Sequence, residues 1–468
     1  MLAYFQISGM HITRGSSRTR KKLSLNLLAQ IQRQFYLAAV PGVISWSKSS
    51  RMFKKIEISH WRQFEKVDID IDSKITIITG SNGAGKTTLL GVLNQHFGWN
   101  PRLLSTPMMD EKTGGITFLT GWWKSLFKKE EDDQHWTKVG KIVYEDNNDS
   151  DIQIPRQSGS SYNLSFSRQS SVRGMHIPSH RPVYSYKEVE AIPTRPKRKE
   201  DYFNEYNSNI INKFTETGDY VKNISPSYLL KQSLIGLATF GYGNTHVVAN
   251  QEYADLFEGF EDILRKLLPK SLGFQRLEIR IPEVVLVTSS GDFSIDAASG
   301  GVASIIGLAW QIFMFAQNKE RYVITIDEPE NHLHPSMQRE LIPNLLSAFP
   351  NAQFVVATHS PFIIGSSKDS SVYALAYNDD NRVFSRKLDM IDKSGSASKV
   401  LREVLGVPVT VPVWVESEIQ EVIEKYSNQN IDETLFERMR IEMKEKGLEE
   451  FMPNAVTLVV EALNDKDN

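Results

Sequence analysis

One short stretch does most to indicate the fold of this chain: Gly80-Ser81-Asn82-Gly83-Ala84-Gly85-Lys86-Thr87-Thr88. It matches G-x-x-x-x-G-K-[ST], the pattern of loops that hold nucleotide phosphates. The apolar run before it, residues 75–79, predicts a strand, and the leucine-rich segment after it, residues 89–93, has helical spacing. Strand, glycine loop and helix in this order are the context that the pattern requires.

The residue types in this loop suit phosphate binding. Glycines allow positive φ angles and let the backbone approach an anion closely. The N–H groups of the loop and of the helix start then point at the phosphates. Lys86 is expected to reach the β- and γ-phosphate oxygens, and the Thr87 hydroxyl is expected to be a Mg²⁺ ligand. The loop therefore predicts a site for a magnesium–nucleotide complex.

Two later strands end in residues that could complete such a site. The apolar segment 321–326 leads to Asp327, a candidate to hold Mg²⁺ through water, and to Glu328, a candidate to polarise the attacking water. The apolar segment 352–358 leads to His359, which could hydrogen-bond the γ-phosphate or that water. Acidic turn residues and a structural histidine remain the plainer alternatives at this point.

A second anion-binding turn is predicted before another helix. Ser299, Gly300 and Gly301 precede residues 303–316, whose apolar positions have helical spacing. A hydroxyl, free backbone N–H groups and the positive end of a helix together attract an anion. Alone, this turn could be a simple N-cap. Beside the other phosphate elements, it predicts a loop that closes on the nucleotide of a second subunit.

Composition sets broad limits. The chain has 468 residues, 40% of them hydrophobic and 24% charged, which is ordinary for a globular protein. A net charge of −2 favours neither binding nor exclusion of nucleic acid, and the lack of cysteine excludes disulfides and thiolate metal sites. The lack of cysteine also suits a reducing cytosol, and we expect a cytoplasmic protein. No apolar run is long enough to span a bilayer, and no membrane partner is expected.

The segment 1–51 is basic and lacks acidic residues. It could be an arm that touches nucleic acid or an anionic surface, a transit peptide, or an extension upstream of a compact protein that starts near Met52. We favour the extension, because strand-like alternation begins directly after it.

The rest of the chain divides into core lobes and insertions. We expect core lobes at 52–97 and 290–394. They are separated by an insertion at 98–289 with a β part and a helical arm or signature subdomain, irregular to about residue 200 and mainly helical from 202 to 272. The tail, 395–468, is expected to be a small helical region for dimerisation or partner docking.

The motifs GSNGAGKTT, ASGG, ITIDEPENHLHP and VVATHSP, in this order, resemble the heads of ABC-type ATPases. The IDEPENHLHP form is similar to the branch that includes the overcoming-lysogenisation-defect nucleases, RecF and SMC-type heads, and the ATPase subunits of anti-phage systems such as Septu and PARIS. The resemblance covers about residues 53–388. It implies an α/β P-loop fold: a mixed sheet flanked by helices, an antiparallel β subdomain, a helical insertion and a small helical C-terminal cap.

The resemblance also implies roles for single residues. A homodimer, or a larger even-numbered assembly, would hold ATP and Mg²⁺ between its subunits, with Ser299 to Gly301 acting on the partner's nucleotide. Asn331 and His332 lie where such heads have a loop at the dimer interface, and a glutamine loop is expected between Phe118 and His180. The residues expected to serve the nucleotide within the same chain are Lys86, Thr87, Asp327, Glu328 and His359.

No nuclease site is expected in this chain. The TOPRIM domain of the related nucleases needs a glutamate and a later D-x-D cluster, but the only early candidates are Glu416 and Glu418, and the one D-x-D that follows is 465–467. We therefore expect an ATP hydrolase that senses and regulates, controlling a separately encoded nuclease or toxin.

The alternative is a DNA-repair ATPase of the RecF kind that binds DNA directly. A basic stripe that includes Arg195, Lys197, Arg198 and Lys199 would support it, although such a run is more often a solvated loop.

Overall fold

The computed structural model describes most of the chain after residue 50. The described ranges are 51–109, 114–120, 135–156, 159–181, 184–194, 197–215, 225–316, 320–393, 395, 397–405, 413–427, 434–453, 455–456 and 459. The predictions for the basic segment 1–50, for Arg195 and for the end of the tail lie outside these residues.

The core is an eleven-stranded mixed sheet in the order β10-β8-β7-β1-β2-β18-β17-β3-β16-β15-β11. Its parallel part contains β3 (Ile75–Gly80), β16 (Ala352–Ala357), β15 (Tyr322–Asp327) and β11 (Gly174–Ile177). Every residue of these four strands is buried, as expected for strands covered on both faces. Strand β17 (Ser371–Tyr377) runs parallel to β3 on its other side.

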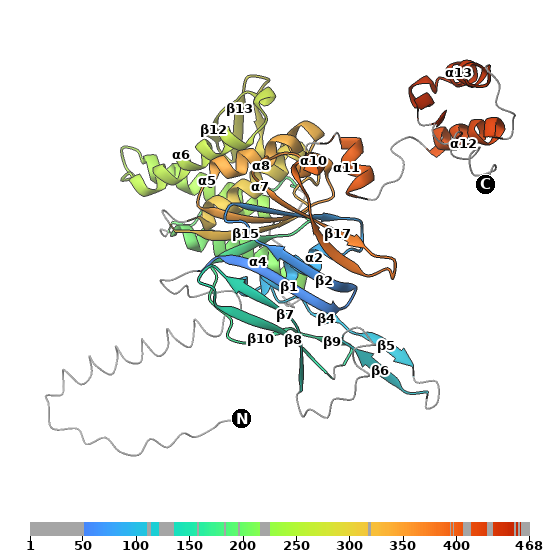
Figure 1. Cartoon of the computed structure of the whole chain (residues 1–468). Helices are drawn as coiled ribbons and strands as arrows, with labels where there is room; N and C mark the ends of the chain where they lie inside the picture. Colours follow the sequence, from blue (N-terminus) through green and yellow to red (C-terminus); the bar gives the residue numbers. More distant parts are fainter. Residues whose placement is uncertain are drawn as a thin grey trace, which may run out of the picture.

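The antiparallel part continues the same sheet. Strand β18 (Val383–Lys387) pairs with β17 in a hairpin and with β2 in parallel, which joins the two parts. In Figure 1, helix α2 (Lys86–Asn94) lies between the parallel and the antiparallel strands, and the short helix η1 (Gln95–Phe97) follows it. The antiparallel strands are β1 (Phe53–Trp61), β2 (Phe64–Asp70), β7 (Trp136–Tyr144), β8 (Asp149–Pro155) and β10 (Ser165–Phe166).

The predicted mixed sheet with an antiparallel part is confirmed. The insertion was expected to contain a β part, but its first hundred residues are more regular than the expected irregular segment. Strands β7 and β8 form a long hairpin that pairs with β1, and β11 forms the far edge of the sheet. The sequence interpretation missed the period-two alternation of β8, in which Ser150, Ile152 and Ile154 are buried and their neighbours are not. The same segment also contains β4 (Leu103–Leu104), β5 (Thr106–Met109), β6 (Ile116–Leu119) and β9 (Ser161–Tyr162).

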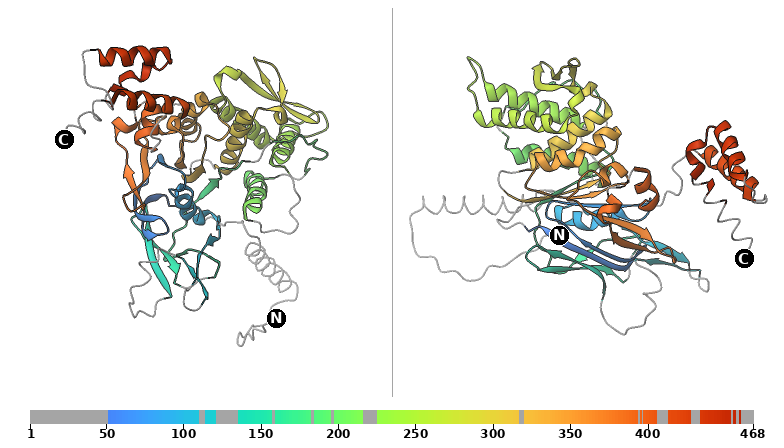
Figure 2. Two further views of the ribbon diagram at one scale, coloured as in Figure 1. Left: turned by 90° about the vertical axis from the view of Figure 1, so that its right-hand side faces the viewer. Right: turned by 45° about the horizontal axis from the view of Figure 1, so that its top comes forward.

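A helical lobe covers one side of the parallel strands (Figure 2). The predicted helices there are confirmed within a few residues, and a small sheet of three strands packs with them. The lobe contains α4 (Lys199–Thr215), α5 (Pro226–Tyr242), α6 (Gln251–Leu267), η2 (Lys270–Leu272), β12 (Phe274–Arg280), β13 (Glu283–Thr288), β14 (Phe293–Ser294), η3 (Ile295–Ala297), α7 (Gly300–Phe315), α8 (Pro335–Ala348) and α9 (Pro361–Ile364).

The C-terminal helices divide between two cores. Helices α10 (Met390–Lys393) and α11 (Ala397–Glu403) follow the hairpin, and Val400, at the centre of α11, belongs to the main core. Helices α12 (Val413–Ser427) and α13 (Leu435–Glu445), with η4 (Glu449–Phe451), form a second hydrophobic cluster. The tail proposed to begin at residue 395 therefore contributes its first helix to the main core. Of the helices described, none is both long and apolar enough to cross a membrane.

Candidate nucleotide site

The glycine loop connects β3 to α2 as the sequence predicts. Gly80 and Gly85 have φ angles of 143° and 95°, which side-chain-bearing residues rarely adopt. A Cβ atom at Gly80 would lie 2.5 Å from the Leu375 carbonyl oxygen, and one at Gly85 would lie 2.5 Å from the Phe64 ring. Only glycine therefore fits at either end of this loop.

Lys86 lies beneath the loop, with little exposure to solvent. Its ammonium donates hydrogen bonds to the carbonyl oxygens of Gly80 (2.9 Å) and Ser81 (3.0 Å). Burial lowers the pKa of Lys86 to about 8, although the carboxylates of Asp327, Glu328 and Glu330 oppose this shift. The loop thus holds a buried ammonium group whose desolvation the nearby carboxylates do not fully offset.

Asp327 ends β15 at the same edge of the sheet, because the carboxyl ends of parallel strands meet there. The Thr87 hydroxyl donates to Asp327 Oδ2 at 2.9 Å. Burial raises the pKa of Asp327 to about 6, and the Thr87 hydrogen bond only partly offsets this. Asp327 Oδ1 is buried and has no hydrogen-bond partner in the part of the chain that the structure describes. A hydroxyl beside an unsatisfied carboxylate suits Mg²⁺, which prefers oxygen ligands.

Glu328 has a φ angle of 46°, a strained value for a residue with a side chain, and its neighbours hold it there. Its N–H donates to the Ala357 carbonyl oxygen (2.8 Å), and its Oε2 accepts from Asn331 Nδ2 (3.0 Å). Its Oε1 lies 3.6 Å from His359 Nε2. The turn after β15 thus points the glutamate toward the histidine that follows β16.

His359 lies between Glu328 and the loop lysine. Its Nδ1 is 3.3 Å from Lys86 Nζ. Burial, and then the nearby Lys86 charge, lower the pKa of His359 below its usual value. The imidazole is therefore neutral near pH 7, and one of its nitrogens can donate a hydrogen bond to a ligand.

Glu330 was missed by the sequence interpretation. Its Oε1 accepts three hydrogen bonds, from Thr358 Oγ1 (2.7 Å), His359 N (2.8 Å) and Ser360 N (3.2 Å). Glu330 therefore fixes the turn that carries His359 to the turn that carries Glu328. The sequence did show Glu330, as the third carboxylate of the segment from Asp327 to Glu330. It did not identify the hydrogen-bond partners of Glu330, which lie 28 to 30 residues further along the chain.

The glutamine loop expected between Phe118 and His180 stays a prediction, because part of that range lies outside the described residues. The loop beside Asp327 and Glu328 follows β11 and contains Ser179, His180 and Arg181 but no glutamine. The Arg181 guanidinium donates to the carbonyl oxygens of Glu328 (2.9 Å) and Pro329 (3.2 Å). The sequence interpretation assigned no role to Arg181.

The turn Ser299–Gly301 begins α7, and Ser299 occupies the N-cap position. The Ser299 side chain is exposed and makes no capping hydrogen bond. Gly301 packs against the loop of Asn331 and His332, since a Cβ atom there would lie 2.9 Å from the His332 carbonyl oxygen. The exposed helix start therefore keeps its hydroxyl and N–H groups available to a ligand or to a second copy.

The described residues of the proposed basic stripe contact neighbouring residues of the same chain, although Arg198 remains exposed at the surface. Lys197 Nζ pairs with Glu205 at 2.7 Å, and Arg198 pairs with Asp201 at 3.6 Å. Lys199 lies 4.0 Å from the centroid of the Phe313 ring, and burial lowers its pKa to about 8. The DNA-binding alternative stays a prediction.

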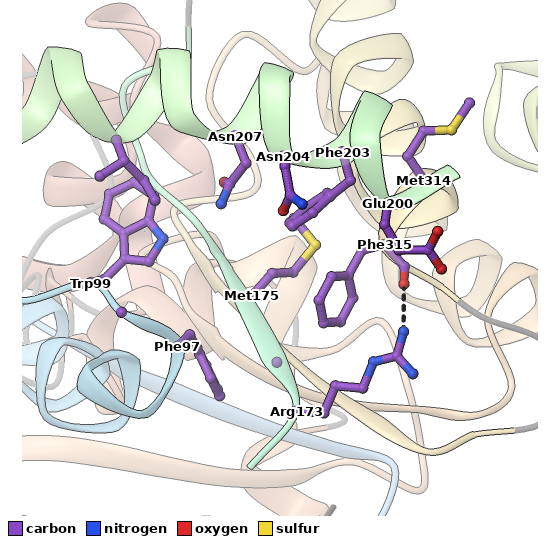
Figure 3. Close-up of a pocket in the computed structure, with 13 residues that line it drawn as sticks. Phe97, Trp99, Arg173, Met175, Glu200, Phe203, Asn204, Asn207, Met314 and Phe315 are labelled. Carbon is purple, nitrogen blue, oxygen red and sulfur yellow. Dashed lines mark hydrogen bonds between the residues drawn. The ribbon is translucent and has the colours of Figure 1, made fainter. Parts of the chain in front are cut away.

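A separate cavity of about 100 Å³ lies between α4, α7 and the start of β11 (Figure 3). Phe203, Asn204 and Asn207 of α4 face Trp99 and Met175 across it, and Arg173 donates to the Phe315 carbonyl oxygen at 3.2 Å. Ligand pockets usually measure several hundred Å³, so this cavity is too small for a nucleotide.

Two protein-family models match the chain: an AAA ATPase domain at residues 185–364 and an AAA domain at residues 55–267. The chain is 27% identical over 186 residues to the Septu protein PtuA of Bacillus thuringiensis. This alignment covers 36% of the chain and 46% of the Septu protein. The chain is 25% identical over 223 residues to a probable ATPase of retron Ec83 from Escherichia coli. This alignment covers 47% of the chain and 36% of the retron protein.

Among solved structures, the chain is similar to the SMC head domain from Thermotoga maritima, with 13% identity and a TM-score of 0.36, over 72% of this chain and 99% of that one. The chain spans less than half the length of the Septu and retron relatives. It therefore matches models of AAA-type ATPase domains and is similar to a Septu protein and a retron ATPase, which confirms the resemblance expected from the sequence.

Proposed function

We propose that this chain binds and hydrolyses MgATP between two copies of itself. One observation carries the proposal: three neighbouring parallel strands bring a lysine loop, a buried acid and a glutamate–histidine pair to one edge of the sheet. Thr87 Oγ1 lies 2.9 Å from Asp327 Oδ2, and Glu328 Oε1 lies 3.6 Å from His359 Nε2. Ser299 to Gly301 of the second copy would supply the remaining contacts to the γ-phosphate.

Each residue has a role that its surroundings suit. Lys86 neutralises phosphate charge, and Thr87 and Asp327 hold Mg²⁺, which when bound supplies positive charge to the phosphates. Glu328 accepts a hydrogen bond from the attacking water and orients it. His359, neutral at pH 7, donates to the γ-phosphate. Positioning and electrostatics of this kind account for most catalysis of phosphoryl transfer.

The test is ATP turnover by the purified chain and by Glu328→Gln, which keeps the size of the side chain but removes the base. We expect this variant to bind MgATP and to lose turnover by about 10²- to 10⁴-fold, the usual contribution of a general base. Glu340→Gln is the matched control, because Glu340 is an exposed glutamate of α8. Equal turnover in Glu328→Gln and the wild type would show that this catalytic assignment is wrong.

We further propose that the ATPase is the sensor and regulatory subunit of a bacterial anti-phage system and controls a separately encoded nuclease or toxin. Its similarity to a Septu protein and to a retron ATPase supports this role. Helices α12 and α13, which have a hydrophobic cluster of their own, are the proposed docking unit for the effector.

Co-expression with the product of the adjacent gene tests the regulatory role. We expect the two proteins to copurify and the effector's activity to differ between wild type and Glu328→Gln. An effector that is equally active alone, with wild type and with the variant would contradict regulation by this chain.

A further inference from the structure

Arg181 connects two parts of the site that act on different nucleotides in the proposed dimer. Besides the carbonyl oxygens of Glu328 and Pro329, its guanidinium donates to Ser304 Oγ, at 2.6 Å. Ser304 belongs to α7, the helix that starts with the Ser299–Gly301 turn. One side chain on the loop after β11 therefore bridges that helix and the turn of the candidate catalytic glutamate.

The two ends of this bridge have separate tasks. Ser304 lies about one helical turn after Gly300, and α7 is buried along most of its length, so its first turn and Ser304 move together. In the proposed dimer, this first turn faces the partner's nucleotide. Glu328 faces the nucleotide of its own chain, and its backbone is already held in a strained conformation.

A cavity of about 190 Å³ lies beside this bridge. Its lining includes Arg181, Tyr184, Gly300, Ser304 and His332. At the cavity the start of α7 is not packed directly against the turn after β15, and the guanidinium bonds join the two; elsewhere Gly301 packs against the His332 carbonyl oxygen. A shift of α7 would therefore be transmitted through the guanidinium as well as through this backbone contact.

We propose that Arg181 is a positioning residue that couples the two nucleotide sites of the dimer. When α7 of one chain contacts the partner's nucleotide, the position of Ser304 in that chain is fixed. Through Arg181, Ser304 fixes the carbonyl group of Glu328, and with it the Glu328 side chain, which faces the nucleotide bound by its own chain. ATP at one site then favours the catalytic arrangement at the other, which is positive coupling. This inference rests on the proposed ATP-bound dimer.

The experiment measures turnover against ATP concentration for wild type and Ser304→Ala. This variant removes the link to α7 but leaves the Arg181 bonds to Glu328 and Pro329. Wild type should show a Hill coefficient of about 1.5 or more, below the limit of two for two sites. Ser304→Ala should fall to about 1, with maximal turnover within about threefold of wild type.

Two further variants separate coupling from packing. Ser304→Thr keeps a hydroxyl and should restore cooperativity. Ser233→Ala is the matched control, because Ser233 and Ser304 are both 8% exposed. Among the described residues, the Ser233 hydroxyl donates within α5, to the Leu229 carbonyl oxygen. Ser233→Ala should keep the wild-type Hill coefficient, since no link between the sites is lost.

Sedimentation of the same samples distinguishes the possible failures. If wild type forms an ATP-dependent dimer but is not cooperative, or if Ser304→Ala keeps the wild-type Hill coefficient, the coupling is overturned and the proposed function stands. If no dimer forms with ATP, the proposed function is overturned and the coupling with it.

Discussion

The antiparallel strands and the nucleotide edge treat the same kind of side chain in opposite ways. On β1, Lys55 lies 2.9 Å from both Glu57 and Asp68, and these hydrogen bonds raise its pKa. At the nucleotide edge, burial lowers the pKa of Lys86 to about 8 and raises that of Asp327 to about 6. In the first region the charges are paired beside solvent, whereas in the second they are buried with incomplete compensation.

This difference indicates that, at the nucleotide edge, stability of the empty protein is lost in favour of ligand binding. Paired surface charges stabilise a fold weakly but leave nothing for a ligand to gain. A buried ammonium and a buried carboxylate with a free oxygen destabilise the empty protein, and a ligand that brings phosphates and a divalent cation relieves that cost. The comparison therefore predicts opposite outcomes for charge removal in the two regions.

The largest expected effect is that of Lys86→Met. The substitution removes the charge but keeps most of the length of the side chain. Charged hydrogen bonds contribute about 1.5–3 kcal/mol each, so ATP affinity should fall by about 10- to 100-fold, and turnover should fall further. Unfolding by urea should show that the variant is no less stable than wild type. A variant that is unstable but binds ATP normally would break the comparison.

Asp327→Asn should stabilise the nucleotide-free protein. Because its pKa is raised from 3.8 to about 6, the ionised carboxylate destabilises the folded chain above pH 6. The gain from its removal should be on the order of 1–3 kcal/mol near pH 7. It should shrink as the pH falls through about 6 and vanish below about 4, where Asp327 is protonated in both states.

Urea unfolding at several pH values, without Mg²⁺ or nucleotide, measures this gain. Binding of Mg²⁺ with the nucleotide should be lost in the same variant. A uniform loss of stability at every pH would contradict the assignment of Asp327 as an uncompensated acid.

The affinity for MgATP should fall as the pH rises above about 8. Phosphates favour the charged form of Lys86, so binding takes up a proton wherever the free protein has lost one. Well above pH 8, the dissociation constant for MgATP should increase about tenfold for each pH unit. Titration calorimetry in buffers of different ionisation enthalpy would detect this proton, and Lys86→Met should not take it up.

The smallest effect is expected for Lys55→Met. Partly exposed ion pairs contribute about 1 kcal/mol or less, so stability should decrease slightly and ATP turnover should not change. Thermal unfolding and turnover measure both quantities. A large change in turnover would show that the two regions are less independent than the comparison assumes.

The sequence predicted the parts of the site that depend on local pattern. The lysine loop, the acidic pair after β15 and His359 after β16 each follow a buried strand whose apolar run is visible in the sequence. These residues lie at one edge because the strands pair in parallel, and the carboxyl ends of parallel strands meet at the same edge in whatever order the strands are arranged. What they do in catalysis remains a proposal.

The missed features depend on contacts between distant residues. Arg181 reaches Glu328 across 147 residues, and β7 pairs with β1 after a long intervening segment. The positive φ angle of Glu328 is imposed by neighbouring residues, so the residue type at position 328 does not predict it. Local periodicity carries no information about such partners.

The central claim is that the lysine loop of one chain and the serine–diglycine turn of another hold the same nucleotide. The chain has no cysteine, so two single-cysteine variants, Asn82→Cys in the loop and Ala297→Cys beside the turn, can be mixed and treated with a short bismaleimide. Both positions are exposed. Cross-linked dimers containing one of each variant should form with MgATP and not without it. No such product, or an equal yield without nucleotide, would contradict the account.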